Sequence, residues 1–131
     1  LRARIKHRGD RSLSLLAALI GGALDIKPIL HCHRGDTGPV GKVRGFEPAA
    51  EKLLGFVAER VRAGLLTPTL CLSYGGELEQ MRALPGYDAL VEACDAHHVE
   101  RFETVMSLTG MVNVGAGSLT VGFAAPPHTF A

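Results

Sequence analysis

Apolar residues recur along the first third of the chain, first with the spacing of an α-helix and then with the pattern of β-strands. From residue 13 to 24 they fall at intervals of three and four, which predicts a helix. Residues 26–33 contain an apolar run, and residues 39–44 alternate between polar and apolar side chains. Because the link 34–38 is rich in turn-forming residues, the two segments are predicted to pair as an antiparallel β-hairpin.

The rest of the chain alternates between helical and strand patterns. Helices are expected at 47–63, 77–84 and 87–96, and strands at 68–74, 99–108, 111–114 and 119–123. With the two pieces 77–84 and 87–96 taken as one helical region, the order is helix, strand, strand, helix, strand, helix, strand, strand, strand. This order predicts an α/β fold, a two-layer sandwich with a mixed sheet and helices on one face. We expect one domain over residues 12–125, a basic leader or linker remnant over 1–11 and a tail over 126–131.

Composition narrows the class of protein. The 131 residues suffice for one domain, and 47% hydrophobic with 21% charged residues is typical of a globular chain. The formal net charge of +1 gives no field that would attract nucleic acid, and no apolar stretch is long enough to span a bilayer. Three scattered cysteines argue against a disulfide framework and favour a reducing compartment, so a cytoplasmic location is expected.

Histidine and cysteine are the first candidates for chemistry. His31 and His33 would share one face of a strand, and two histidines can hold a metal ion, but zinc needs further protein ligands. Polar residues beside a turn, with Cys32 in the core, are the favoured interpretation. Cys71 and Cys94 lie in apolar segments and are expected to be buried and inert. We therefore predict no catalytic residue, no metal site and no cofactor.

Two features are better suited to binding an anion. The loop Gly115-Ala116-Gly117-Ser118 could expose consecutive backbone N–H groups as an anion nest, or simply bend the chain between two strands. Arg44 ends the second hairpin strand beside Gly45, where its guanidinium could bind a carboxylate or phosphate; taken alone, a surface arginine is the favoured interpretation.

The amino-acid sequence of the predicted hairpin resembles that of one bacterial family. Ile26-Lys27-Pro28-Ile29-Leu30 with Pro39-Val40-Gly41-Lys42-Val43-Arg44-Gly45 is similar to the "IKPIL…PVGKVRG" hairpin of the DegV fatty-acid-binding proteins. Gly115 to Leu119 resembles their closing "H-x-G-P-G" segment. The resemblance extends from about residue 12 to 123 and corresponds to the C-terminal domain of that family.

The resemblance implies a function that the residues alone do not. Members of this family hold a long-chain fatty acid between an N-terminal domain and this C-terminal domain, and some present it to a fatty acid kinase. The resemblance implies that the ligand-binding residues are Arg44, Asn113, Gly115, Gly117 and Ser118. Asn113 stands where the family has histidine, and Ser12 where it has a second arginine. Candidate tunnel or core residues are Leu16, Ile20, Ile29, Phe102 and Met106.

The leading hypothesis is therefore a lipid-binding protein, not an enzyme. Its expected partners are a long-chain fatty acid, a missing N-terminal domain and a kinase, with a homodimer also considered. The alternatives are a small α/β enzyme subunit using His31 or His33, and a non-catalytic regulatory or assembly domain.

Overall fold

The structure is a computed structural model, which describes residues 25–108 and 117–130. The chain divides into two compact units, Leu1–Ala49 and Ala50–Ala131, called here the hairpin unit and the sheet unit. The predicted helix at 13–24 and the predicted strand at 111–114 lie outside the described residues, as do the candidate core residues Leu16 and Ile20. Within the described ranges, no helix is long and apolar enough to cross a membrane.

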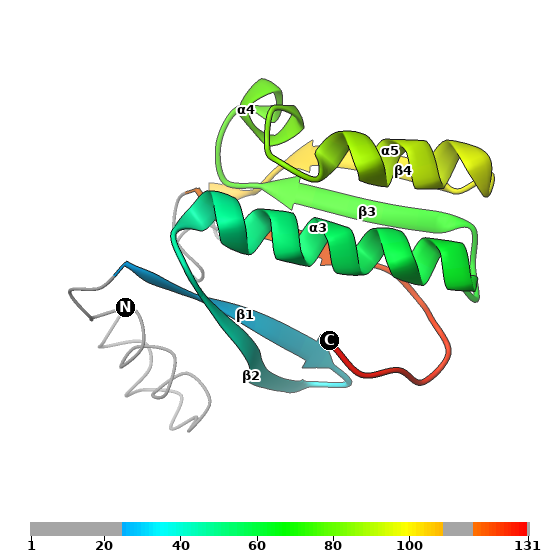
Figure 1. Cartoon of the computed structure of the whole chain (residues 1–131), viewed down its shortest axis with the longest axis horizontal. Helices are drawn as coiled ribbons and strands as arrows, with labels where there is room; N and C mark the ends of the chain where they lie inside the picture. Colours follow the sequence, from blue (N-terminus) through cyan, green and yellow to red (C-terminus); the bar gives the residue numbers. More distant parts are fainter. Residues whose placement is uncertain (1–24, 109–116, 131) are drawn as a thin grey trace. The chain divides into compact units, whose positions relative to one another are not determined.

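The hairpin unit contains the predicted antiparallel pair. Strand β1 (Ile26–His33) pairs with β2 (Asp36–Arg44), in a register that joins Ile26 to Arg44 and His33 to Asp36 (Figure 1). The pairing is confirmed, but the turn is shorter than the link expected between 34 and 38. Arg34 and Gly35 alone make it, with φ of 50° and 86°. Positive φ at both central residues is typical of a two-residue type I′ turn, whose twist matches that of the strands.

The sheet unit is built on a three-stranded sheet in the order β4-β3-β5. Its strands are β3 (Thr69–Tyr74), β4 (Glu100–Val105) and β5 (Leu119–Gly122). Strand β3 runs parallel to β4 and antiparallel to β5, so the sheet is mixed as predicted. The strand expected over 99–108 is shorter than predicted and extends from Glu100 to Val105. The hairpin strands form a two-stranded sheet of their own.

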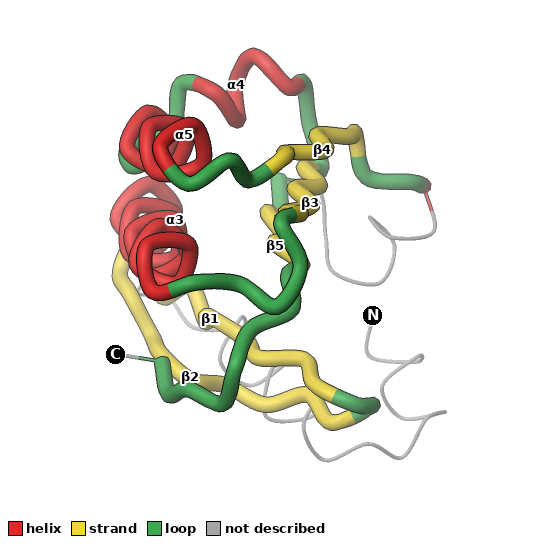
Figure 2. Tube along the Cα trace, turned by 90° about the vertical axis from the view of Figure 1, so that its right-hand side faces the viewer, coloured by secondary structure: helices red, strands yellow, loops and turns green. Residues whose placement is uncertain are grey.

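Helices cover one face of this sheet. They are α3 (Phe46–Ala63), of which residues 50–63 belong to this unit, α4 (Leu78–Arg82) and α5 (Tyr87–Ala96). Figure 2 shows α3 and α5 side by side on the same face of the β4-β3-β5 sheet. The predicted α/β class, with a mixed sheet and helices on one face, is thus confirmed.

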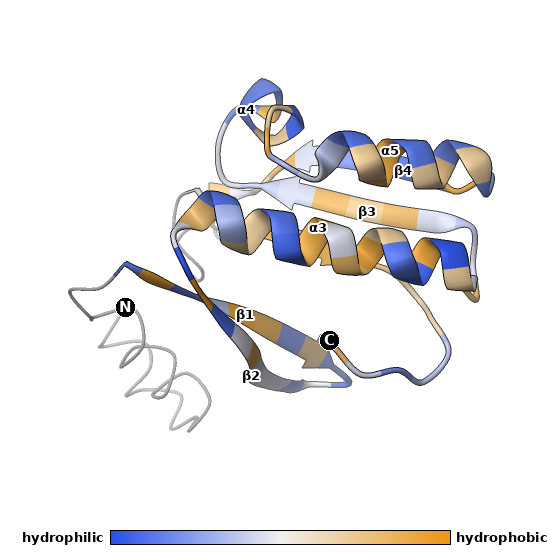
Figure 3. Cartoon of the chain, viewed as in Figure 1, coloured by the Kyte–Doolittle hydropathy of each residue, from blue (hydrophilic) through white to orange (hydrophobic). Residues whose placement is uncertain are grey.

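Apolar burial explains why these elements form. Hydrophobic and hydrophilic residues both occur along α3 (Figure 3). Its buried residues repeat at helical spacing: Ala50, Leu54, Val57, Ala58 and Val61. On β3 every second residue is buried: Leu70, Leu72 and Tyr74. Gly86 opens α5 with φ of 93°, and a Cβ there would lie 3.2 Å from the Leu54 Cβ. A glycine at this position therefore permits both the left-handed backbone and the close approach to α3.

Of the candidate core residues that are described, two are buried and one is not. Ile29 and Met106 are 6% and 7% exposed, whereas Phe102 is 52% exposed. Phe102 pairs with Cys71 of β3, between the buried positions Leu70 and Leu72, so it lies on the sheet face opposite the helices. Phe102 is therefore not a core residue, and its assignment to a tunnel stays a prediction.

The C-terminal segment packs on α3 within the sheet unit. The ring centroids of Phe56 and Phe130 are 4.6 Å apart, and the His128 ring lies 5.5 Å from Phe56 and 6.0 Å from Phe123. The Lys52 ammonium stands 5.6 Å from the centroid of the Phe130 ring. These aromatic and cation–π contacts hold the segment against the helix although it has no regular secondary structure.

Candidate functional site

Arg44 lies at an open hollow near the end of the hairpin that joins α3. The hollow has a volume of about 340 Å³ and is lined by Ile26, Lys42, Val43 and Arg44. Arg44 is the last residue of β2, and the N–H of Gly45 that follows donates to the Asp25 carbonyl at 2.9 Å. The pairing of Ile26 with Arg44 sets the apolar and cationic side chains beside each other. Such a lining can accept an anionic group that carries an apolar tail.

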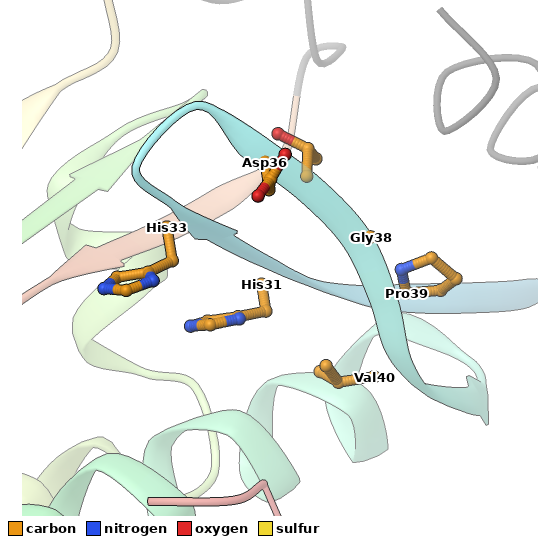
Figure 4. A pocket seen from close by; sticks show the side chains of 7 residues that line it. His31, His33, Asp36, Gly38, Pro39 and Val40 are labelled. Carbon is orange, nitrogen blue, oxygen red and sulfur yellow. The ribbon is translucent and has the colours of Figure 1, made fainter. Parts of the chain in front are cut away.

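The other end of the hairpin carries the two histidines. His31 and His33 line a second hollow of about 350 Å³ together with Asp36, Thr37, Gly38, Pro39 and Val40 (Figure 4). The imidazole rings lie on the same side of β1, with centroids 5.7 Å apart and planes inclined by 13°. Cys32 points to the opposite side, where its sulfur accepts a hydrogen bond from the Thr37 hydroxyl at 3.6 Å.

The glycine loop is described only from Gly117 onward, so Asn113 and Gly115 lie outside the described residues. The Gly117 N–H donates to the Gly75 carbonyl, and the Gly75 N–H donates to the Ser118 carbonyl, both at 2.8 Å. These bonds join the loop before β5 to the end of β3. Because the Gly117 N–H is already engaged, it is not available for an anion nest, and a bend between strands describes Gly117 better.

A charged network that the sequence did not indicate lies between β4 and the helices. One oxygen of Glu103 accepts a hydrogen bond from Nε of Arg82 at 2.9 Å and forms an ion pair with Nη2 of Arg82, also at 2.9 Å; the other oxygen accepts a hydrogen bond from the Tyr87 hydroxyl. The Arg101 guanidinium is 3.9 Å from Glu103 and 3.8 Å from Asp95. In the sequence, charged and apolar residues alternate along β4, and the side with Phe102 was expected to face the core. In the structure the opposite side, with the charged residues, contacts the helices.

These contacts determine the ionisation of the cluster. Burial opposes the charged form of Glu103, but hydrogen bonds from Tyr87 and Arg82 outweigh it and lower the pKa of the Glu103 carboxyl. Burial, together with the hydrogen bond to Glu103, raises the pKa of Tyr87. The hydrogen bond and the charge of Glu103 raise the pKa of Arg82. The network therefore favours an ionised Glu103 that joins α4, α5 and β4.

The lowered pKa gives a testable pH dependence. Since the unfolded carboxyl would bind its proton more tightly, the stabilisation is fully present above the ordinary glutamate value of 4.5 and is lost as pH falls through the lower folded value. We expect Glu103→Gln to lower the free energy of unfolding by about 1 kcal/mol at neutral pH, allowing for solvent screening, and to flatten the loss of stability below pH 4.5. Urea unfolding between pH 3 and 7 measures both effects. Glu59→Gln, on the exposed side of α3, is the control, and equal acid sensitivity of both variants would contradict the prediction.

Two expectations about cysteine are corrected. Cys94 is fully buried, as predicted, and burial raises the pKa of its thiol. Cys71 and Cys32, both expected to be buried, are exposed. In a strand, neighbouring side chains point to opposite faces. Cys71 lies between the buried Leu70 and Leu72 of β3, and Cys32 lies between His31 and His33 of β1. Strand alternation thus places Cys71 on the sheet face away from the helices.

Comparison with known proteins identifies relatives along nearly the whole chain. The family model described as "Uncharacterised protein, DegV family" matches residues 5–126. A DegV domain-containing protein of Xanthomonas axonopodis pv. citri is 62% identical over 130 residues, and one of Xanthomonas campestris pv. campestris is 60% identical over 130 residues. Each alignment covers 99% of this chain but 41% of the relative. The chain therefore spans about two fifths of the length of these curated relatives.

Proposed function

The chain belongs to the DegV family, and from this membership we propose that it is the C-terminal part of a two-domain carrier of long-chain fatty acids. The carrier binds its ligand without chemical change, in the cytoplasm of a bacterium. An N-terminal domain supplies the other wall of the binding site. This proposal gives a role to the hairpin, whose amino-acid sequence resembles that of the family.

The observation that carries the proposal is the position of Arg44. It is an exposed cation at the end of a strand, and the hollow beside it has both apolar and cationic walls. A guanidinium can bind a carboxylate through two parallel hydrogen bonds, while Ile26, which pairs with Arg44, offers apolar surface to the methylenes next to it. A fatty acid presents this combination, a single carboxylate on an apolar chain.

In this proposal the remaining ligand contacts come from the loop before β5. The family resemblance proposes Asn113, Gly115, Gly117 and Ser118 as these further ligand-binding residues. An asparagine amide can donate a hydrogen bond but cannot carry a proton between groups or hold a positive charge. Presentation of the carboxylate to a fatty acid kinase would therefore depend on hydrogen bonding at position 113 and on the charge of Arg44.

Replacement of Arg44 tests the assigned contact. We expect Arg44→Ala to weaken palmitate binding by about 10- to 100-fold, because the loss of one charge-assisted contact costs about 1.5–3 kcal/mol. Titration calorimetry should use the chain with its N-terminal domain restored, so that the proposed site is complete. Unchanged urea unfolding would show that the loss is one of contact and not of fold.

Arg62→Ala is the matched control, because it removes another exposed arginine, from the last turn of α3. Equal affinities of the parent and Arg44→Ala would reject the role of Arg44. Mass spectrometry of the gently purified parent under native conditions tests the ligand class independently. A co-purified acyl chain would support the carrier, whereas protein that repeatedly purifies without any lipid would count against it.

A further inference from the structure

The tip of the hairpin holds its two histidines in a defined geometry. The two-residue turn at Arg34 and Gly35 fixes the register that pairs His33 with Asp36. Because side chains two residues apart on a strand point to the same side, this register sets both imidazoles over the hollow at the tip (Figure 4). The spacing of the two backbone positions is therefore a property of the strand and does not depend on a flexible loop.

The distance between the rings suits a shared ion. Imidazole nitrogens bind first-row metals at about 2.0–2.1 Å, so a bridging ion allows the two ring centroids to lie up to roughly 6.5 Å apart. The observed separation is 5.7 Å. Both side chains are exposed, so rotation about their side-chain bonds can turn one nitrogen of each ring toward a common point.

We propose that His31 and His33 form a two-imidazole chelate for a late first-row divalent metal ion, of which Ni²⁺ and Zn²⁺ are the probes. Imidazole suits these ions, whereas Ca²⁺ and Mg²⁺ require oxygen ligands. This site goes beyond the proposed lipid binding, and it uses none of the residues assigned to the fatty acid.

The chemistry of the surroundings defines what kind of site this is. Asp36 lines the same hollow, but in residues 25–108 and 117–130 no three His, Cys, Asp or Glu side chains are grouped closely enough to hold one ion. A closed structural zinc site needs four protein ligands. The chelate therefore leaves coordination positions to water or to a side chain of another molecule, and its affinity should be moderate.

Titration calorimetry with NiCl₂ on the chain of residues 1–131, prepared without an affinity tag, tests the proposal. We expect one ion per chain with a dissociation constant on the order of 100 μM or lower. His31→Ala and His33→Ala should each weaken binding by at least about tenfold, since each turns a chelate into a single contact. Far-ultraviolet circular dichroism checks that the variants remain folded.

Two controls separate the chelate from general histidine or thiol binding. The double variant His97→Ala/His98→Ala removes the same number of imidazoles from adjacent positions after α5, and should bind like the parent. Cys32→Ser should also bind like the parent, because the Cys32 side chain lies on the other side of β1. Zinc-dependent shifts of the imidazole nitrogen resonances of His31 and His33 would support the site directly. The proposal would be overturned if the His31→Ala/His33→Ala variant bound as tightly as the parent, or if the parent did not bind at about 1 mM Ni²⁺.

Discussion

We expect the chain of residues 1–131 to bind palmitate at least about a thousandfold more weakly than the proposed two-domain carrier. Burial of the acyl chain drives binding, at about 0.8 kcal/mol for each methylene removed from water. If one wall of the site is missing and about five methylenes remain wet, about 4 kcal/mol is lost, which corresponds to a factor of about a thousand. Parallel calorimetric titrations of the two proteins measure the difference.

Exposed apolar side chains should also promote self-association of the 131-residue chain. Phe102 and Val105 of β4 are each 52% exposed, and Val40 of the hairpin is 40% exposed. Exposed apolar groups of this kind favour association when no partner covers them. Light scattering during the titration therefore serves as a control for loss of monomer. Submicromolar palmitate affinity of the monomeric 131-residue chain would show a complete pocket and would contradict the two-domain proposal.

The second large effect is expected in the core of the sheet unit. Leu72 is fully buried at the middle of the central strand β3, between Glu103 of β4 and Val121 of β5. Leu72→Ala should lower the free energy of unfolding by about 2–5 kcal/mol, because the lost transfer energy is increased by the cavity that remains. Equilibrium urea unfolding, followed by circular dichroism, measures the change.

Cys71→Ala is the matched control for this substitution. It alters the preceding residue of the same strand, whose side chain is exposed on the opposite face of the sheet. We expect its effect to be within about 0.5 kcal/mol. Similar destabilisation by both substitutions would mean that the two faces of β3 are equally buried, in conflict with the arrangement of α3 and α5 on one face.

Short-range patterns in the sequence determined most of the elements. The spacing of apolar residues over 47–63 predicts α3, since a helical stripe must be buried to be stable. The two apolar segments flanking Arg34 and Gly35 predict the hairpin, because strands joined by so short a link can pair only antiparallel. The amino-acid sequence of that hairpin also indicated the family. All these features depend on residues that are close together in the chain.

The tertiary structure alone decided which face of each strand is covered. The sequence shows that Phe102 and Glu103 point to opposite sides of β4, but not which side meets α4 and α5. The helices meet Glu103, because Tyr87 and Arg82 supply the hydrogen bonds that make a carboxylate stable there, and Phe102 is left exposed. Such partners lie 16 and 21 residues away in the chain. Local periodicity gives the alternation of a strand, whereas the choice between its two faces depends on contacts that only the folded chain brings together.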